Sequence, residues 1–384
     1  MDKKFNVLVL TDIIPQDEKG GSGTVAWELS RVLSDRGHKV IIITKGKSNK
    51  EKKETTTNIQ IHRYYSDPFK FRKIWKKVLS KDTPDIINGH SPYTTYWATC
   101  LNKKIPMVYT FQSPWHEEYE IRNKDLKRSF IKKMFGSVLR KRMEYKVLKC
   151  AKKIMAASRF MHDKIQKYHK LNSQIIPLGV DIKKFVPAKD VSSIRQKLNI
   201  QKEKFVILTI RNLVSRMGLE NLVQSMADIS KKNPNSCLII GGTGYLKEKL
   251  ERQINGLNLQ NFIRLEGYID DGIIQMYYQS ADLFVLPTRL LEGFGLVTLE
   301  SMACGTPVLA TPVGANIELL GKFDNSFLFK GIESNNITEG IINFIPKYLN
   351  QKDIIRKKCR EFVEKNYSWD KYADEVEKIF YEFI

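Results

Sequence analysis

The chain has 384 residues, 42% hydrophobic and 28% charged, which fits a soluble protein of two domains that each bury a core. No apolar run approaches the ~20 residues of a membrane-spanning helix. The formal net charge is +22, and it is uneven: residues 1–188 hold 39 Lys and Arg against 18 Asp and Glu, whereas residues 189–384 hold 25 against 24. A basic half indicates an anionic partner, which can be a membrane surface, a nucleic acid or an acidic substrate.

The first half alternates short apolar runs with helical patterns. We expect strands over 7–10, 40–43, 85–87 and 108–111, with 154–158 and 175–181 completing the domain. This alternation predicts a parallel sheet covered by helices. Asp12 follows the first run without a small-residue cleavage site, which favours a strand over a signal peptide. The five cysteines are odd in number and far apart, which argues against disulfides and predicts a reducing, cytoplasmic setting.

A glycine-rich segment, 20–24, separates the first two strands and precedes a helix expected over 25–36. Glycines before a helix N-terminus suit phosphate binding, which makes Gly21 and Gly23 candidates for a nucleotide ligand. The spacing lacks the full Gly-x-Gly-x-x-Gly pattern, which disfavours a nicotinamide cofactor. An ordinary surface loop is the alternative.

Two segments of the first half are basic and amphipathic. In residues 70–81, the apolar side chains fall on one helix face and six basic residues cover the rest. Residues 122–149 are expected to form a longer helix with eleven basic and two acidic residues. Such helices can lie on anionic lipid, or they can pack on the core with a solvated lysine face, and both interpretations stay open.

Polar loops follow several predicted strands, where ligands bind in doubly wound sheets. In the first half these loops contain four candidate residues: His90, Gln112, Trp115 and His116. In the second half, strands are expected over 205–210, 237–241, 262–265, 282–286, 307–310 and 327–329. Arg211 and Arg216 follow the first of these strands, and guanidinium groups suit bidentate contacts with phosphate.

The segment 282–318 is the most informative part of the sequence. A strand over 282–286 is followed by Glu292-Gly-Phe-Gly and then by a helix expected over 296–303. The start of a helix favours an anion, and carboxylates at Glu292 and Glu300 can accept hydrogen bonds from sugar hydroxyls. The pattern therefore predicts a ligand that is both phosphorylated and polyhydroxylated.

Glu292 and Glu300 with seven residues between them, Gly-Phe-Gly after the first and Cys304-Gly-Thr-Pro after the second resemble the hallmark of retaining GT-B glycosyltransferases of family 4. The resemblance implies an α/β fold of two Rossmann-like, doubly wound domains that face across a cleft. It also implies a C-terminal helix that crosses back to the first domain. We expect an acceptor-side domain over 1–187, a nucleotide-sugar-binding domain over 188–366 and the returning helix over 367–384.

The resemblance also implies a role for each candidate residue. Glu292 would hold a hydroxyl of the transferred sugar, Glu300 would hold the ribose, and Arg211 with Arg216 would bind the diphosphate. The family usually has a lysine in the second phosphate contact; here Arg216 is five and Met217 six residues after Arg211, and we assign Arg216. Further donor-binding residues would be Gly21, Gly23, Gly242, Gly244, Tyr268, Gly293, Phe294, Gly295, Leu296 and Val297. The acceptor-side residues would be His90, Trp115, His116 and Gln112, which stands where the family usually has histidine.

The implied function is transfer of a sugar, with retention, from a UDP- or GDP-sugar to a hydroxyl of a lipid-linked or anionic glycan acceptor in glycolipid, lipopolysaccharide or other cell-envelope polysaccharide synthesis. No cofactor is expected, and without an Asp-x-Asp triplet we expect metal-independent transfer. We expect a cytoplasmic monomer or homodimer, peripheral on the anionic inner membrane face, that binds no nucleic acid. The alternatives are a non-catalytic sugar-nucleotide-binding subunit of a glycan assembly complex, a nucleic-acid-binding protein, and a phosphorylase or epimerase on the same architecture.

Overall fold

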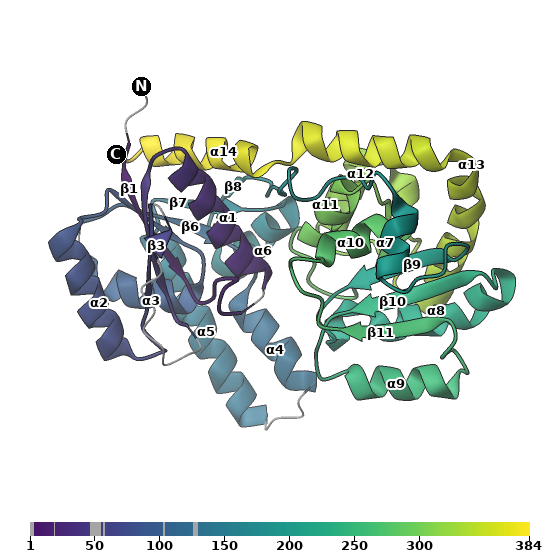
Figure 1. Cartoon of the computed structure of the whole chain (residues 1–384). Helices are drawn as coiled ribbons and strands as arrows, with labels where there is room; N and C mark the ends of the chain where they lie inside the picture. Colours follow the sequence, from purple (N-terminus) through teal and green to yellow (C-terminus); the bar gives the residue numbers. More distant parts are fainter. Residues whose placement is uncertain (1–3, 19, 47–54, 57, 103, 126–129) are drawn as a thin grey trace. The chain divides into compact units, whose positions relative to one another are not determined.

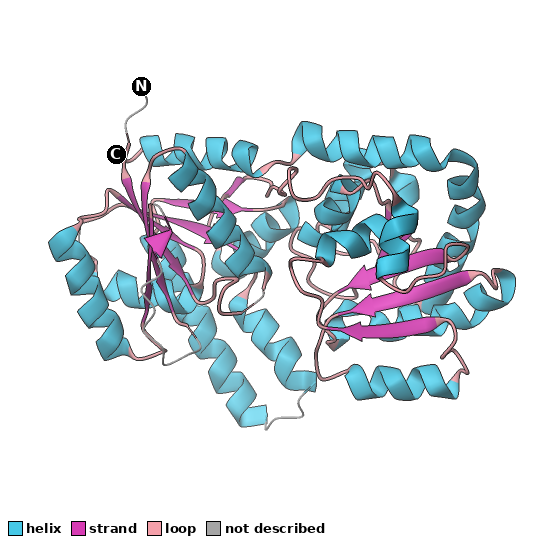
Figure 2. Cartoon of the chain, in the orientation of Figure 1, coloured by secondary structure: helices cyan, strands magenta, loops and turns pink. Residues whose placement is uncertain are grey.

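The computed structural model describes residues 4–18, 20–46, 55–56, 58–102, 104–125 and 130–384 (Figure 1). The chain divides into two compact units. Unit 1 comprises Met1–Leu178 together with Trp369–Ile384, and unit 2 comprises Gly179–Ser368. Each unit is an α/β structure with one sheet and helices around it (Figure 2).

The sheet of unit 1 has the strand order β3-β4-β2-β1-β5-β6-β7-β8, in which β3 and β4 pair antiparallel and the other pairs are parallel. Its central strands are almost entirely apolar and buried, as expected for a parallel sheet covered on both faces. Its strands are β1 (Asn6–Thr11), β2 (Lys39–Thr44), β3 (Thr55–Thr56), β4 (Ile59–Arg63), β5 (Ile86–Gly89), β6 (Met107–Phe111), β7 (Lys153–Ala156) and β8 (Gln174–Ile175). Its helices are α1 (Gly21–Asp35), α2 (Pro68–Lys81), α3 (Pro92–Leu101), α4 (Trp115–Asp125), α5 (Phe130–Cys150), α6 (Arg159–His169) and α14 (Trp369–Tyr381).

The sheet of unit 2 is parallel throughout its described pairs, in the order β11-β10-β9-β12-β13. Its strands are β9 (Phe205–Ile210), β10 (Ser236–Gly241), β11 (Ile263–Gly267), β12 (Leu283–Leu286) and β13 (Val308–Ala310). Its helices are α7 (Val191–Lys197), α8 (Leu219–Lys232), α9 (Lys247–Gly256), α10 (Ile274–Ser280), α11 (Leu296–Ala303), α12 (Asn316–Phe323), α13 (Ser334–Asn366) and the short 3-10 turns η1 (Ser215–Met217) and η2 (Asn325–Phe327).

Both sheets contain a point where the chain order reverses. In unit 1, β1 lies between β2 and β5, and in unit 2, β9 lies between β10 and β12. In doubly wound sheets, ligands bind beyond the carboxyl ends of the two strands at such a switch point. The loops that follow β9 and β12 are therefore where unit 2 is expected to bind its ligand.

The C-terminal helix belongs to unit 1, in agreement with the predicted fold. Helix α14 packs against α1, and Glu377 of α14 forms ion pairs with Arg36 and with His38, whose Nε2 lies 2.6 Å from Glu377 Oε1. The ring of Phe5, just before β1, lies edge-on to those of Phe380 and Tyr381. The last residues of the chain thus complete the core of the first unit.

The division between the units falls before the boundary at residue 187 that the sequence suggested. The segment after Leu178 is bound to the end of α13. The N–H of Val180 donates to the Tyr367 carbonyl at 3.2 Å, and Arg360 donates to the carbonyls of Ile182 and Phe185 at 2.9 and 2.5 Å. These contacts attach 179–187 to unit 2.

Three expected elements differ from the structure. The glycine-rich segment 20–24 is not a loop, because α1 already begins at Gly21. The helix expected over 122–149 is two helices, α4 and α5, and residues 126–129, including the expected apolar position Leu126, lie outside the described residues. The strand expected over 327–329 is a 3-10 turn followed by an isolated bridge between Ala310 and Leu328.

The two basic amphipathic segments differ in how much of their apolar surface is buried. On α2, the apolar side chains Phe71, Trp75 and Val78 are buried in the core of unit 1, so this helix covers the sheet and exposes its lysines. On α5, only part of the apolar side chains, such as Val147 and Leu148, is buried, and others are exposed: Met134, Phe135, Val138, Leu139 and Tyr145. No helix among the described residues is long and apolar enough to cross a membrane.

Candidate active site

An ion pair joins the carboxyl ends of the two strands at the switch point of unit 2. Arg211 directly follows β9, and Glu292 lies in the loop between β12 and α11. Arg211 Nη2 donates to Glu292 Oε2 at 2.7 Å, and the two side chains are only 7% and 8% exposed. The structure therefore brings together two of the three predicted catalytic residues, and it pairs them with each other.

The loops after β9 and β12 are also joined through their backbones. The N–H groups of Arg289 and Leu290 donate to the Arg216 carbonyl at 2.8 and 3.3 Å. In return, Arg216 Nη1 donates to the Leu291 carbonyl at 3.0 Å. Leu291 has a φ of 58°, a left-handed conformation that non-glycine residues adopt only where their surroundings impose it. Glu292 thus follows a residue whose backbone is held in place.

Two buried side chains contact the Arg211–Glu292 pair. Thr288 Oγ1 donates to Glu292 Oε2 at 2.9 Å, and Arg211 Nη2 lies 2.9 Å from Met217 Sδ. The side chain next to the Arg211 guanidinium is therefore that of Met217 and not that of Arg216. The assignment of Arg216 to the second phosphate contact remains a prediction, and its guanidinium bonds to a backbone carbonyl beside Glu292.

The glycine turn after β10 lies against the Arg211 loop. Gly242 has a φ of 128°, and a Cβ there would lie 1.8 Å from the carbonyl oxygen of Arg211. A Cβ on Gly244 would lie 2.3 Å from the carbonyl oxygen of Leu213. Because no side chain fits, glycine is required for the two loops to approach. The structure thus gives Gly242 and Gly244 a packing role, and their contact with a donor remains a prediction.

The start of α11 supplies hydrogen-bond donors beside the ion pair. Gly295 precedes the helix with a φ of 91°, and its carbonyl accepts the N–H groups of Thr298 and Leu299. The N–H groups of Leu296 and Val297 come too early in the helix to have an acceptor within it, which is the arrangement that favours a phosphate. Gly293 and Phe294 complete the turn, and the Phe294 ring packs on Tyr367 at 6.1 Å.

Glu300, the second carboxylate of the motif, is held by a tyrosine. Tyr278 OH donates to Glu300 Oε2 at 2.6 Å. Burial raises the pKa of Tyr278 well above its usual range, and the Glu300 charge raises it further. The phenol therefore stays protonated at neutral pH and fixes the carboxylate. Tyr268, the predicted neighbour of the base, is 58% exposed directly after β11.

Two buried side-chain oxygens near the start of α11 belong to residues that were not predicted from the sequence. Thr298 Oγ1 and Asn316 Oδ1 are buried without a hydrogen-bond partner among the described residues. They lie 3.1 and 3.8 Å from the place that a Cβ on Gly295 would occupy. Buried polar atoms normally have partners, so these two are candidates for contact with a ligand. Nothing in the sequence around Asn316 marks it as part of this site.

The predicted acceptor-side residues in unit 1 are largely buried. His90 follows β5, is 1% exposed, and its Nδ1 lies 3.4 Å from Gln112 Nε2. Burial lowers the pKa of His90 to about 3, so the ring is neutral at physiological pH. His116 is 5% exposed and faces Glu144. The indole of Trp115 lies under Arg140, 5.0 Å from its guanidinium carbon. Contact of these four residues with an acceptor remains a prediction.

Gly21 and Gly23 also lie in unit 1, within the first turn of α1. Gly23 is buried, and a Cβ there would lie 3.0 Å from the backbone oxygen of Ile13. Close packing of α1 on the loop after β1 accounts for this glycine. Their contact with a donor remains a prediction.

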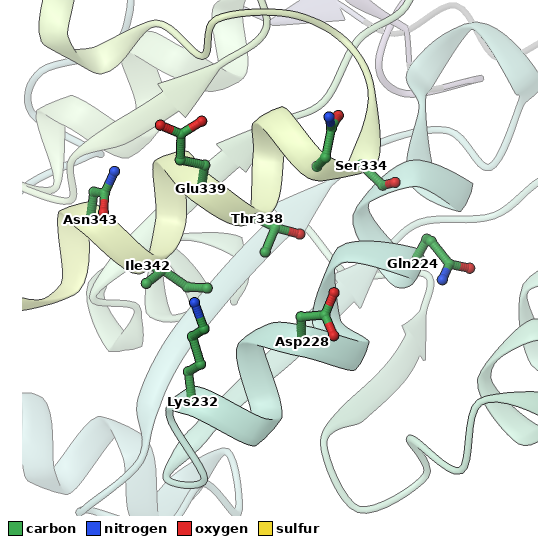
Figure 3. A pocket seen from close by; sticks show the side chains of 9 residues that line it. Gln224, Asp228, Lys232, Ser334, Thr338, Glu339, Ile342 and Asn343 are labelled. Carbon is green, nitrogen blue, oxygen red and sulfur yellow. The ribbon is translucent and has the colours of Figure 1, made fainter.

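Figure 3 shows a polar pocket of unit 2 with a volume of about 300 Å³. Its lining comes from α8 and α13, for example Asp228 and Lys232 on the first helix and Glu339 on the second. None of the predicted site residues lines it.

Comparison with known proteins relates both halves of the chain to glycosyltransferases. Residues 190–369 match the family model described as glycosyl transferases group 1, and residues 19–184 match the one described as Glycosyltransferase Family 4. An uncharacterised glycosyltransferase of Methanocaldococcus jannaschii is 28% identical over 186 residues, 48% of this chain and 47% of that protein, so the aligned part is about half of each.

Two further proteins extend the comparison to most of the chain. The alpha-monoglucosyldiacylglycerol synthase of Acholeplasma laidlawii is 25% identical over 308 residues, which cover 75% of this chain and 76% of that protein. The structure of Anabaena HepE in complex with UDP-glucose superimposes with a TM-score of 0.80 at 18% identity, covering 98% of this chain and 100% of that one. With both sequence families matched and the fold shared along the chain, this protein belongs to the GT-B glycosyltransferases of the group 1, family 4 type.

Proposed function

We propose that the chain transfers a sugar, with retention at the anomeric carbon, from a UDP- or GDP-sugar to a hydroxyl group of an acceptor. The observation that carries the proposal is the buried Arg211–Glu292 pair at the switch point of unit 2, beside the N-terminus of α11. A cation and helix N–H groups suit a diphosphate, and a carboxylate suits a sugar hydroxyl. HepE, solved with UDP-glucose, supports a nucleotide-sugar donor.

In this proposal the donor replaces each partner of the ion pair with one of its own groups. The diphosphate takes the place of Glu292 as the acceptor for Arg211, and a sugar hydroxyl donates to the freed Glu292 oxygen. Thr288 keeps its hydrogen bond to Oε2 and so holds the carboxylate in position. Arg216 adds positive charge on the same loop, and Glu300, held by Tyr278, accepts from the ribose.

The chemical step depends on negative charge that grows on the leaving diphosphate. Once the donor is bound, Arg211 and the N–H groups of Leu296 and Val297 face the diphosphate, so they stabilise the growing charge without further reorganisation during the reaction. The leaving phosphate oxygen would take the proton of the acceptor hydroxyl, which is how the family resemblance accounts for retention. No step in this scheme requires a metal ion or another cofactor.

For the acceptor we propose a lipid-linked or anionic glycan, as in glycolipid or cell-envelope polysaccharide synthesis. Two facts support this choice. The synthase of Acholeplasma laidlawii is named for a glucosyldiacylglycerol product, and residues 1–188 hold nearly all of the excess positive charge. A basic surface attracts an anionic acceptor before any specific contact forms.

We further propose that α5 binds an anionic membrane surface and that the protein is peripheral there. Its exposed apolar side chains include Phe135 at 76% and Leu139 at 55%. Basic residues alternate with them along the helix, among them Lys141, Arg142 and Lys146, which are also exposed. Apolar side chains within a ring of lysine and arginine are the features of a helix that lies in the lipid interface.

The direct test is a thermal-shift panel with UDP, GDP, ADP and their sugars, followed by a transfer assay with the stabilising donor. A ligand that binds only the folded state raises the melting temperature. Arg211→Lys should keep the fold and lose most of the shift, since a lysine cannot make the bidentate contact. A shift without transfer to any lipid-linked or glycan hydroxyl would instead favour a non-catalytic binding subunit, and no shift with any nucleotide would overturn the proposal.

A further inference from the structure

Three buried side chains from three helices of unit 1 converge on one point. His116 is in the first turn of α4, Glu144 is on α5, and His169 is the last residue of α6. Their side chains are 6%, 0% and 1% exposed. The residues are far apart in the sequence, and of the three only His116 was among the predicted site residues, as an acceptor-side candidate.

The two imidazoles face the same carboxylate oxygen. His116 Nδ1 lies 3.4 Å and His169 Nε2 lies 3.1 Å from Glu144 Oε2. These three atoms all lie within 4.8 Å of one another. The other oxygen, Glu144 Oε1, accepts the backbone N–H of Trp115 at 3.0 Å. Glu144 Oε1 is thus bonded to the protein backbone, and Glu144 Oε2 faces the two histidines.

We propose that His116, Glu144 and His169 form a zinc site that joins α4, α5 and α6. Two imidazole nitrogens and one carboxylate oxygen are a ligand set that Zn²⁺ uses. At Zn–ligand distances of about 2.0–2.2 Å, neighbouring ligand atoms in a tetrahedral site lie roughly 3.3 Å apart. The two nitrogen–oxygen separations in the structure, 3.4 and 3.1 Å, are close to this value.

The alternative is a purely hydrogen-bonded cluster. The His169 separation of 3.1 Å fits an ordinary N–H···O hydrogen bond, which spans about 2.7–3.2 Å, whereas the His116 separation of 3.4 Å is longer. A metal ion bonded to both nitrogens and to Glu144 Oε2 accounts for the longer separation.

The rings are oriented by their aromatic neighbours. Tyr145 stacks on His169 with 6.0 Å between ring centroids, and Tyr168 lies edge-on to His116 at 4.5 Å. These aromatic contacts restrict how the two rings can turn, which keeps the ligand nitrogens directed at one place. A bound ion would fix the start of α4, and with it Trp115, the first residue of that helix.

The experiment uses the full chain, stripped of metal with a chelator and titrated with Co²⁺ as a spectroscopic probe. We expect one Co²⁺ per chain with the visible bands of tetrahedral coordination, and loss of these bands when one equivalent of Zn²⁺ is added. His169→Gln should weaken Co²⁺ binding by at least tenfold. His162→Gln is the matched control, because His162 is on the same helix, faces Ser173 and lies outside the cluster.

The readout is independent of transferase activity. All five tryptophans, at positions 27, 75, 97, 115 and 369, belong to unit 1, so tryptophan fluorescence shows whether this unit is folded in each variant. If the His169→Gln variant does not fold, the His116→Gln variant is used instead. The Co²⁺ titration of the wild type tests the proposal even if neither variant folds. Absence of tetrahedral Co²⁺ bands in the folded wild type would overturn the proposal, as would equal binding by a folded ligand variant.

Discussion

The Glu292 carboxylate accepts a hydrogen bond from Arg211 at 2.7 Å, so the charges of the two residues most implicated in transfer neutralise each other. If either side chain were removed, the charge of the other would be buried without its partner. Because of this pairing, a substitution of either residue has two effects that must be measured separately. It changes the stability of unit 2 and also the transfer reaction.

We predict that Glu292→Ala destabilises unit 2 by about 3–5 kcal/mol, because Arg211 is left as a buried charge without a partner. Glu292→Gln should destabilise unit 2 less, since its amide oxygen still accepts a hydrogen bond from Arg211. This variant should nevertheless lose most of the transfer activity. Chemical denaturation followed by far-UV circular dichroism and a donor-turnover assay measure the two effects. Glu339→Gln, on the exposed side of α13, is the control and should change neither. An alanine variant with wild-type stability and activity would contradict the role given to this pair.

We predict that Thr288→Val slows transfer while leaving the fold intact. The substitution keeps the shape and removes the hydroxyl that donates to Glu292 Oε2 at 2.9 Å. A hydrogen bond to a charged group contributes about 1.5–3 kcal/mol, which corresponds to roughly a 10- to 100-fold loss in kcat/KM. Thr209→Val is the matched control: Thr209 is equally buried on β9, and its hydroxyl has no partner among the described residues. Equal effects of the two substitutions would show that Thr288 has no positioning role.

The sequence predicted much of this site because its signals are local. The strand over 205–210 and the helix over 296–303 have the bounds that the structure gives them, since each is a buried apolar run with a clear break at both ends. Arg211 and Glu292 were identified from the motif. Their mutual ion pair was not, because it depends on β9 and β12 being neighbours in the sheet, and strand order is not a local property.

The predictions that were wrong also concern contacts between segments that are distant in the sequence. The glycines at 20–24 favour a loop on propensity alone, yet tertiary packing places α1 directly on the loop after β1. Periodicity could not show that α5 leaves more of its apolar side chains exposed than α2 does. Glu144 and His169 gave no signal at all, because the contacts that define their cluster join three separate helices.

We predict that Gly242→Ala abolishes the thermal shift produced by the nucleotide. A Cβ at this position would lie 1.8 Å from the Arg211 carbonyl oxygen, and the backbone has a φ of 128°. The loop must therefore move, taking Arg211 with it, and the strain should destabilise unit 2 by about 1–3 kcal/mol. Gly256→Ala, at the end of α9 with open space around it, should leave the shift unchanged. A Gly242→Ala variant with a full nucleotide shift would show that this close approach does not matter for binding.

We predict that His90 makes unit 1 sensitive to acid. Its pKa is about 3 in the folded protein because of burial, and a histidine in the unfolded chain titrates near 6.5. Between these values the unfolded state binds more protons, so stability falls as the pH decreases. At pH 5 this amounts to about 2 kcal/mol relative to pH 7. Between pH 7 and pH 5, the His90→Gln variant should lose about 2 kcal/mol less stability than the wild type. Tryptophan fluorescence during denaturation measures this difference. His62→Gln, on a half-buried histidine of β4, controls for the loss of an imidazole, and identical pH dependence in wild type and His90→Gln would contradict the prediction.

We predict that Leu139→Glu prevents binding to anionic vesicles without unfolding the protein. Leu139 is 55% exposed on α5, so a polar side chain is tolerated in water, whereas insertion into the lipid interface would be lost. Burying a leucine contributes about 1.5–3 kcal/mol, so we expect roughly a 10- to 100-fold weaker partition into phosphatidylglycerol vesicles. Leu349→Glu is the matched control, because Leu349 is 63% exposed on α13, within residues 189–384, which have almost no excess charge. Wild-type binding should weaken with salt and should be low on neutral phosphatidylcholine. If both variants bind like wild type, α5 is not the lipid contact, and the exposed apolar side chains of this helix must serve another partner.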